Sequence, residues 1–296
     1  MTHVATLICN PRVPVLTLPV AERVRALLEG AEPAWLAEDV AADIPFTLKT
    51  PHPSSAAALI RSELAPLPID CVVQANAHRR KRLLVADMDS TMIAQECIDE
   101  LADSAGLKPQ VAAITERAMR GELAFEPALR ERVALLKDLS VDVIATVLRE
   151  RIRLTAGGRE LVQTMRAHGA HTCLVSGGFM GFVDKIGAML GFDETRGNVL
   201  LTAGGKLAGA IQEPILGREA KLAALIELRE RFGIDRNETL AVGDGANDLA
   251  MIQEAGLGVA FHAKPVVAEA AAARIDHGDL TALLYAQGYR NEEFSA

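Results

Sequence analysis

Aromatic residues and cysteines are scarce in this chain, and its 31 basic residues are outnumbered by 39 acidic ones. Aromatic side chains make up 4% of the 296 residues, so any core must rest on Leu, Val, Ile and Ala. The formal net charge is −8, which argues against a general nucleic-acid binder because such proteins usually carry a basic face. The four cysteines form no C-x-x-C pair, so we expect buried reduced thiols and neither a disulfide framework nor a zinc site.

Long apolar runs are missing too. No stretch approaches the roughly 18–20 apolar residues of a membrane-spanning helix. Prolines and Arg12 interrupt the apolar N-terminus, and no basic segment precedes it. We therefore expect neither a membrane protein nor a secretory signal, and a cytoplasmic location. Half of the residues are hydrophobic, which suffices for a substantial core, and the length suits two domains.

Residues 1–78 predict a small α+β domain. Strands are expected at 5–9, 40–48 (one or two short strands) and 70–74, and helices at 20–28 and 54–63. This β-α-β(β)-α-β order is typical of ferredoxin-like sandwiches. A basic run at 78–82 follows and lies between two apolar strands. We therefore expect a solvated linker there and place the domain boundary within it.

Residues 79–296 predict a parallel α/β sheet. Short apolar runs, typical of strands covered on both faces, occur at 83–86, 172–175, 239–242 and 257–261. Helical segments separate these runs. Such alternation implies right-handed crossovers. More than 80 residues separate the first two runs, and most have helical periodicity. We expect them to form a helical cap at about 94–153, inserted after the first strand over the end of the sheet.

Polar clusters accompany the first three of these strands, and ligands of open α/β sheets bind at the carboxyl ends of strands. The clusters contain Asp87 and Asp89, then Ser176, Gly177 and Gly178, then Asp244, Asn247 and Asp248. A serine hydroxyl and a glycine backbone at a turn into a helix suit a phosphate. Lys221, near the start of a helix between the second and third strands, can add positive charge.

Four carboxylates near one crevice repel one another unless a cation compensates them. A hard cation with oxygen ligands is the obvious remedy, and Mg²⁺ prefers few carboxylates together with water and phosphate. A metal and a lysine could neutralise phosphate oxygens while one carboxylate attacks phosphorus and another protonates the leaving alcohol. The combination predicts phosphoryl transfer.

These clusters resemble the ordered motifs of the haloacid dehalogenase (HAD) superfamily over about residues 82–287. The stretch 87–91 matches its D-x-D-x-T signature, Ser176 its second motif, Lys221 its third and 243–248 its fourth. Within the superfamily, the chain resembles the phosphoserine phosphatase family, in the stretches 87–93, 96–100, 115–121, 125–136, 175–179 and 242–248. One departure is Ala156, where that family is expected to have proline.

The resemblance implies a phosphatase that hydrolyses O-phosphoserine to serine and inorganic phosphate through an aspartyl-phosphate, as the last step of the phosphorylated route to serine. Asp87 matches the nucleophile and Asp89 the general acid and then base. Mg²⁺ is expected on Asp87, on the backbone carbonyl of Asp89 and on Asp244. Asp248 is not expected to bind the metal directly but to orient Lys221.

The resemblance also implies how the substrate is held. The phosphate is expected to contact Ser176, Gly177 and Lys221, and the remaining substrate contacts are expected from Glu96 (to the ammonium), Arg132 (to the carboxylate), Met119, Phe125, Gly178 and Asn247. Some bacterial relatives carry an ACT-like domain ahead of the phosphatase domain. Residues 1–78 are similar to it in topology only, and suggest regulation or homodimerisation.

Other functions compete with this one. Another HAD small-molecule phosphatase or a phosphoserine-dependent phosphotransferase would keep Asp87 and change the substrate or the acceptor. A phospho-accepting receiver module would store the phosphate on aspartate. The predicted cap and Asp89 argue against a receiver, because closure over the phosphate and proton transfer to a leaving group both serve turnover.

Overall fold

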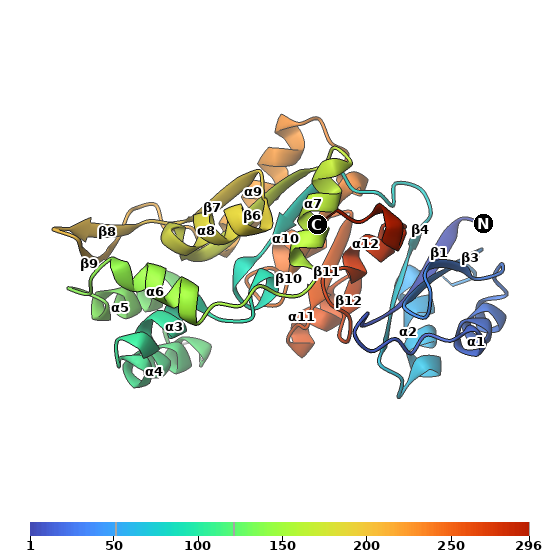
Figure 1. The fold of residues 1–296 in the computed structure, drawn as a ribbon, viewed down its shortest axis with the longest axis horizontal. Coiled ribbons are helices and arrows are strands. Elements are labelled where there is room, and N and C mark those ends of the chain that lie inside the picture. The colour runs from blue at the N-terminus through green and yellow to red at the C-terminus, as the bar shows by residue number, and fades with distance from the viewer. Residues whose placement is uncertain (51, 121, 296) are drawn as a thin grey trace.

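Figure 1 shows the computed structural model of the protein, which describes residues 1–50, 52–120 and 122–295. An N-terminal unit lies at one end of the long axis, a parallel sheet with its helices lies in the middle, and a group of helices with a β-hairpin lies toward the other end (Figure 1). Within the described ranges, none of the helices combines the length and hydrophobicity needed to cross a bilayer.

The N-terminal unit has the predicted α+β architecture. Its elements are β1 (His3–Cys9), α1 (Leu18–Leu28), β2 (Ala34–Ala37), β3 (Ala41–Phe46), α2 (Pro53–Leu64) and β4 (Ile69–Ala75). The antiparallel sheet has the order β2-β3-β1-β4, with the β-α-β-β-α-β succession of ferredoxin-like folds. A proline in the first helical turn starts both helices, where its missing N–H costs nothing.

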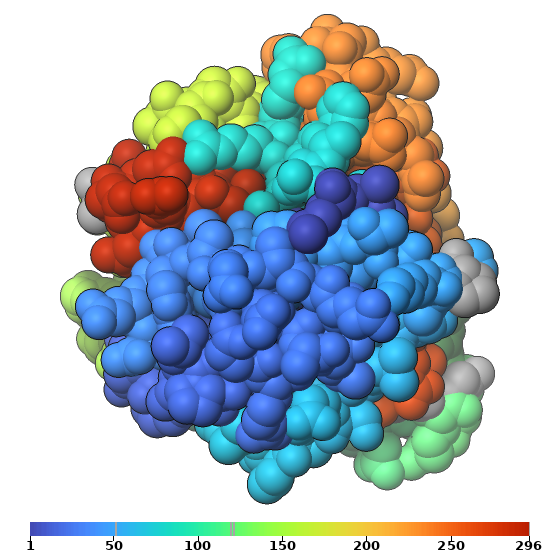
Figure 2. Space-filling view, turned by 90° about the vertical axis from the view of Figure 1, so that its right-hand side faces the viewer, coloured from blue at the N-terminus to red at the C-terminus, as the bar shows by residue number. Residues whose placement is uncertain are grey.

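The N-terminal sheet is covered on both faces. Leu7 and Cys71 point to one side and pack with α1 and α2. Ile8 and Val72, their neighbours in sequence, point to the other side, because successive strand residues face opposite sides. They belong to the hydrophobic cluster that also contains residues of the central sheet and its helices. Figure 2 shows the outer surface of this unit in blue, bordered by the red C-terminal segment.

The basic run at 78–82 is only in part the solvated linker that the sequence suggested, because His78, Arg80 and Arg82 are exposed whereas Arg79 and Lys81 are held by the folded chain. Arg79 donates two hydrogen bonds to the buried Asp43, at 2.7 and 2.9 Å, and a third to Thr6 at 3.1 Å. Lys81 is buried and donates to the backbone carbonyls of His78 and Asn237. Burial lowers the pKa of Lys81 to about 8. The expectation failed for Arg79 and Lys81 because Asp43, Thr6 and Asn237 come from segments far away in the sequence.

The central sheet is parallel throughout and confirms the predicted α/β fold. Its order is β12-β11-β10-β5-β6-β7, with β5 (Leu83–Ala86), β6 (His171–Phe179), β7 (Glu194–Asn198), β10 (Thr239–Gly243), β11 (Leu257–Phe261) and β12 (Ala273–Ile275). The four predicted strands are present. The two edge strands, β7 and β12, were not predicted, because β7 is polar and β12 has three residues.

Helices cover both faces of this sheet. Leu84 and Ala86 of β5 pack with α7 (Gly158–Ala167), α8 (Met180–Leu190) and α12 (Ala282–Ala286). Leu83 and Val85 pack on the opposite side with α9 (Arg218–Arg231) and α10 (Leu249–Glu254). The short α11 (Pro265–Ala270) follows β11. This two-sided burial explains the uninterrupted apolar runs in the strands.

The cap between β5 and α7 consists of α3 (Cys97–Ser104), α4 (Lys108–Met119), α5 (Phe125–Leu135) and α6 (Asp142–Glu150), which confirms its predicted helical character. A hairpin of β8 (Leu200–Ala203) and β9 (Lys206–Ile211) leaves the core and packs on α5. Asp138 N–H donates to Leu207 O at 2.9 Å, and Leu207 N–H donates to Leu139 O at 2.8 Å. The hairpin thereby fastens the α5–α6 loop to the core.

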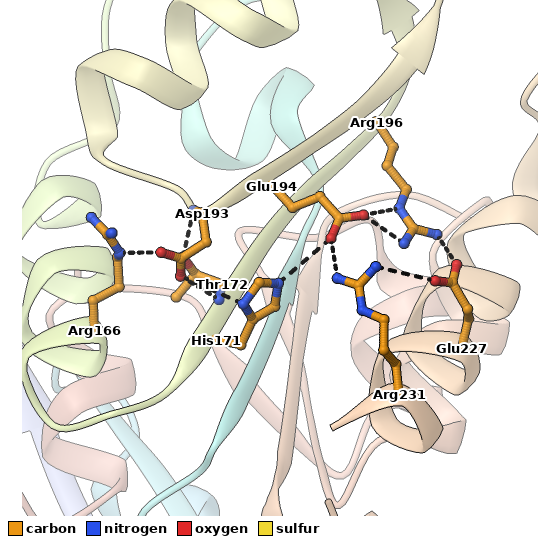
Figure 3. Close-up of polar contacts among 8 residues, drawn as sticks. All are labelled: Arg166, His171, Thr172, Asp193, Glu194, Arg196, Glu227 and Arg231. Carbon is orange, nitrogen blue, oxygen red and sulfur yellow. Dashed lines mark hydrogen bonds and ion pairs between the residues drawn. The ribbon is translucent and has the colours of Figure 1, made fainter. Parts of the chain in front are cut away.

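A polar network fastens the edge strand β7 (Figure 3). Asp193 accepts a hydrogen bond from Arg166 of α7 at 2.6 Å. Glu194 pairs with Arg196, at 2.6 Å, and with Arg231 of α9. The network lies at the amino ends of β6 and β7, whereas ligands of such sheets bind at the carboxyl ends. It therefore supports the sheet and lies away from the polar clusters.

Candidate active site

A cavity of about 390 Å³ lies where the carboxyl ends of β5, β6 and β10 meet the cap. The wall is formed by the segment after β5, the cap helices, the end of β6 and the loops after β10 and β11. Its residues are Asp87, Asp89, Glu96, Ile98, Asp99, Thr115, Phe125, Leu129, Arg132, Ser176, Gly177, Gly178, Phe179, Asp244, Gly245, Asn247 and Lys264. Of the predicted site residues, Lys221 and Asp248 lie behind this wall. The side chain of Met119 lies outside the described part of the structure.

Asp87 follows the last residue of β5 and is 4% exposed. Its Oδ1 accepts the Met88 N–H at 2.8 Å and lies 2.6 Å from the Lys221 ammonium. Burial raises the pKa of Asp87, and the positive charge of Lys221 opposes that rise. One oxygen is thus held by two donors, in a position from which a fixed carboxylate can attack a bound group.

Asp89 lies in η1 (Met88–Met92), a tight turn whose Ser90 has a φ of 56°. That left-handed conformation is uncommon for a residue other than glycine. Asp89 Oδ1 accepts the Cys97 N–H at 2.8 Å, and Oδ2 accepts the Ser176 hydroxyl at 3.0 Å. Burial raises the pKa of Asp89 despite these bonds. A carboxyl that keeps its proton more readily is suited to general acid catalysis.

Lys221, in the first turn of α9, is 1% exposed and bridges two carboxylates. Its Nζ lies 2.6 Å from Asp87 Oδ1 and 2.6 Å from Asp248 Oδ1. Burial alone would lower the pKa of Lys221, but the two carboxylates raise it above its ordinary value, so the ammonium stays charged. Gly243 makes room for this arrangement, because a Cβ there would lie 2.4 Å from Asp248 Cγ.

Three carboxylates could contribute to a metal site. Oxygens of Asp87, Asp244 and Asp248 lie within 4.8 Å of one another. Asp248 already uses Oδ1 for Lys221 and Oδ2 for the Gly245 N–H at 3.0 Å. Burial and then Asp248 raise the pKa of Asp244. The cluster carries more negative charge than one ammonium balances, and its oxygen donors are those that a hard divalent cation prefers.

Ser176, Gly177 and Gly178 do not form the predicted turn. They lie within β6, which continues to Phe179 with a shift of register against β7 between Val175 and Phe179. The Ser176 Oγ accepts the Gly178 N–H at 2.8 Å. A Cβ on Gly178 would lie 3.1 Å from Asp89 Oδ2, so glycine leaves room for that carboxyl.

The cap supplies two acids, Glu96 and Asp99, and one base, Arg132, to the cavity. Glu96 precedes α3 and accepts the Ser90 hydroxyl at 2.7 Å. Glu96 is exposed and lines the cavity. Desolvation there, followed by the Asp89 charge, raises the pKa of Glu96 to about 7. Arg132 of α5 donates to the Ala128 carbonyl at 3.3 Å, and burial lowers its pKa.

Phe125 connects the cap with the core although it is 44% exposed. A Cβ on Gly177 would lie 3.3 Å from its Cζ, and a Cβ on Gly217 would lie 3.6 Å from its Cδ1. The ring therefore packs against both glycines, and a side chain at Gly177 would require it to shift by a few tenths of an ångström.

Several residues of the wall were not predicted from the sequence. They are Ile98, Asp99, Thr115, Leu129, Phe179, Gly245 and Lys264. A signal existed for Lys264, which closely follows the carboxyl end of β11, the same position that marks the other clusters. The cap residues had no such signal, because helical periodicity does not say which face covers the sheet.

Comparisons with known proteins agree with this geometry. The family model of haloacid dehalogenase-like hydrolases matches residues 84–253. A phosphoserine phosphatase from Polaromonas sp. is 50% identical over 208 residues, which cover 69% of this chain and 88% of that protein. A phosphoserine phosphatase from Archaeoglobus fulgidus is 44% identical over 226 residues, 76% of this chain and 65% of that protein.

Structural similarity extends to the N-terminal unit. The crystal structure of a probable phosphoserine phosphatase from Vibrio cholerae aligns over 99% of this chain and 88% of that one, with a TM-score of 0.80 and 31% identity. Identity and coverage at this level, together with the matched family model, establish the relationship. The chain belongs to the haloacid dehalogenase-like hydrolases and, among them, to the phosphoserine phosphatase family.

Proposed function

We propose that this protein hydrolyses O-phosphoserine to serine and inorganic phosphate. The observation that carries the proposal is that one cavity contains both carboxylates suited to phosphoryl transfer and charged cap residues suited to an amino acid. The core offers Asp87 and Asp89 for phosphoryl transfer, and the cap offers Glu96 and Arg132. A substrate with a phosphate, an ammonium and a carboxylate matches all of these charges. The relatives named phosphoserine phosphatase support the same conclusion.

The first half-reaction transfers the phosphoryl group to the protein. An Asp87 oxygen attacks phosphorus while the bond between phosphorus and the serine oxygen breaks. Asp89, protonated, donates its proton to that oxygen, and serine leaves as the neutral alcohol. The raised pKa of Asp89 favours this protonated form.

The second half-reaction restores the carboxylate. Asp89, now ionised, takes a proton from a water molecule whose oxygen attacks phosphorus. The bond between phosphorus and Asp87 breaks, inorganic phosphate leaves, and both side chains return to their initial state. The Ser176 hydroxyl, 3.0 Å from Asp89, keeps the acid in place through both steps.

A Mg²⁺ ion would be held by Asp87, the backbone carbonyl of Asp89 and Asp244, and when bound it would neutralise phosphate oxygens. Asp248 would serve Lys221 instead, because both of its oxygens are engaged in hydrogen bonds. Ser176, Gly177 and Lys221 would bind the phosphate. Glu96 would accept hydrogen bonds from the substrate ammonium and Arg132 would hold the carboxylate, with Phe125, Gly178 and Asn247 completing the pocket.

The test is release of inorganic phosphate from O-phosphoserine by the purified chain, with Mg²⁺ and with excess chelator. We expect rapid release that depends on Mg²⁺, and none above background from Asp87→Asn. A chain that is folded and loaded with Mg²⁺ but releases phosphate only from other esters would contradict the proposed substrate. Transfer to an added alcohol in place of water would favour a phosphotransferase.

A further inference from the structure

Asn198 is a buried polar residue that motif reasoning gave no reason to select. It is the last residue of β7, is 2% exposed and lies opposite Phe179 in the pairing of β6 with β7. Its Nδ2 donates to the carbonyl of Gly177 at 2.8 Å and to that of Leu216 at 3.1 Å. Its Oδ1 accepts the Leu216 N–H at 2.7 Å. The amide is thus fully used by two backbone segments.

The first of these segments lies in the wall of the cavity. The peptide between Gly177 and Gly178 is held at both ends, since its carbonyl accepts from Asn198 and its N–H donates to the Ser176 Oγ at 2.8 Å. The shifted register of β6 interrupts its regular pairing with β7 here. A side-chain amide therefore does what the sheet ladder does elsewhere and fixes the orientation of this backbone.

The second segment leads to the lysine of the site. Leu216 precedes Gly217, the N-cap of α9, and Lys221 lies in the first turn of that helix. By bonding both the N–H and the carbonyl of Leu216, Asn198 holds the entry of α9 against β7. One buried amide thus connects the two segments that carry Ser176 and Lys221.

We propose that Asn198 is a positioning residue that aligns the phosphate-binding backbone of 176–178 with Lys221. The inference rests on the proposed function only in taking the phosphate to bind at these residues, and it is independent of which ester is hydrolysed. Groups that bind an anion in fixed positions gain their effect from such supporting contacts, because the donors need no rearrangement when the anion arrives.

The matched control is Gln287, which is 1% exposed and also bonds only backbone and core groups. It accepts the Lys81 N–H at 3.0 Å and donates to the Leu283 carbonyl at 2.9 Å. It does not belong to the wall of the cavity. Losing its amide should reduce stability without altering phosphate binding.

The experiment measures binding of inorganic phosphate by calorimetry in the presence of Mg²⁺, together with kcat and KM for phosphoserine and for an aryl phosphate. The variants are Asn198→Ala, the isosteric Asn198→Asp and Gln287→Ala, each with its thermal midpoint. We expect the Kd of phosphate to rise about 10-fold in both Asn198 variants, because both lose the amide donor to the Gly177 carbonyl, and a buried hydrogen bond is worth about that factor. Both substrates should lose kcat/KM equally. The Gln287 variant should keep the wild-type Kd.

A folded Asn198→Asp chain with wild-type phosphate affinity would overturn the proposal, as would an equal rise in Kd for Gln287→Ala. If the alanine variant does not fold, Asn198→Ser replaces it, because serine keeps a donor at the site and should raise the Kd less than aspartate does. Phosphate binding is read without turnover. A wild-type chain that binds phosphate but does not hydrolyse phosphoserine would therefore defeat the proposed substrate and leave this inference intact.

Discussion

Removing the Arg132 guanidinium should cost the protein its preference for phosphoserine. Arg132 lines the cavity, and its one side-chain hydrogen bond within the described residues goes to the Ala128 carbonyl at 3.3 Å. The two terminal NH₂ groups of the guanidinium are thus available for a carboxylate, which they can hold by two parallel hydrogen bonds. Loss of such a charge-assisted contact in an enclosed site costs about 2–4 kcal/mol, or about 30–1,000-fold in kcat/KM.

The assay compares kcat/KM for phosphoserine and for an aryl phosphate in the wild type and in Arg132→Ala. The phosphoserine value should fall by that factor, and the aryl phosphate value should stay within a few-fold. Arg130→Ala is the control, because Arg130 is exposed on the same helix and pairs with Glu126 and Glu213. Equal losses on both substrates, or a similar loss in the Arg130 variant, would mean that the cap was disturbed and would refute carboxylate recognition by Arg132.

Three further predictions follow from the site and its supports. Gly243→Ala should lower kcat by about 100-fold, because its Cβ would lie 2.4 Å from Asp248 Cγ and displace the partner of the lysine; an unchanged kcat would contradict this. The KM for phosphoserine should rise as pH falls through about 7, where Glu96 gains a proton and loses the charge that binds ammonium, and Glu96→Gln should flatten this dependence. Arg79→Ala should lower the free energy of unfolding by about 3–5 kcal/mol in denaturant titrations, because it leaves Asp43 buried without its partner, whereas a loss below 1 kcal/mol would count against that ion pair.

The sequence predicted the centre of the site because strand ends are readable. Asp87, Ser176 and Asp244 each follow or end an apolar run, and the parallel order of the strands brings such residues to one edge. The cap was recognised by its helical periodicity. Glu96 and Arg132 reached the cavity wall as expected, but only the family resemblance had singled them out from other helix charges.

Features that depend on distant partners could not be predicted. The basic run looked like a linker because the residues around it in the sequence do not show that Arg79 pairs with Asp43, 36 residues earlier. The stretch 176–178 looked like a turn because the bulge that keeps it in β6 arises from pairing with β7. That strand has a polar sequence without the apolar pattern of the central strands. The sequence therefore did not indicate Asn198, although its side chain bonds the Gly177 carbonyl in the cavity wall and both backbone groups of Leu216.

The central claim is that Asp87 becomes covalently phosphorylated during turnover. The most direct measurement is mass spectrometry of the protein after rapid acid quench with phosphoserine and Mg²⁺. The account predicts one added phosphoryl group, located on the peptide that contains Asp87, sensitive to hydroxylamine as an acyl phosphate is, and absent from Asp87→Asn. An actively hydrolysing wild-type protein that never carries this group, or an Asp87→Asn variant that hydrolyses phosphoserine at the wild-type rate, would contradict the account.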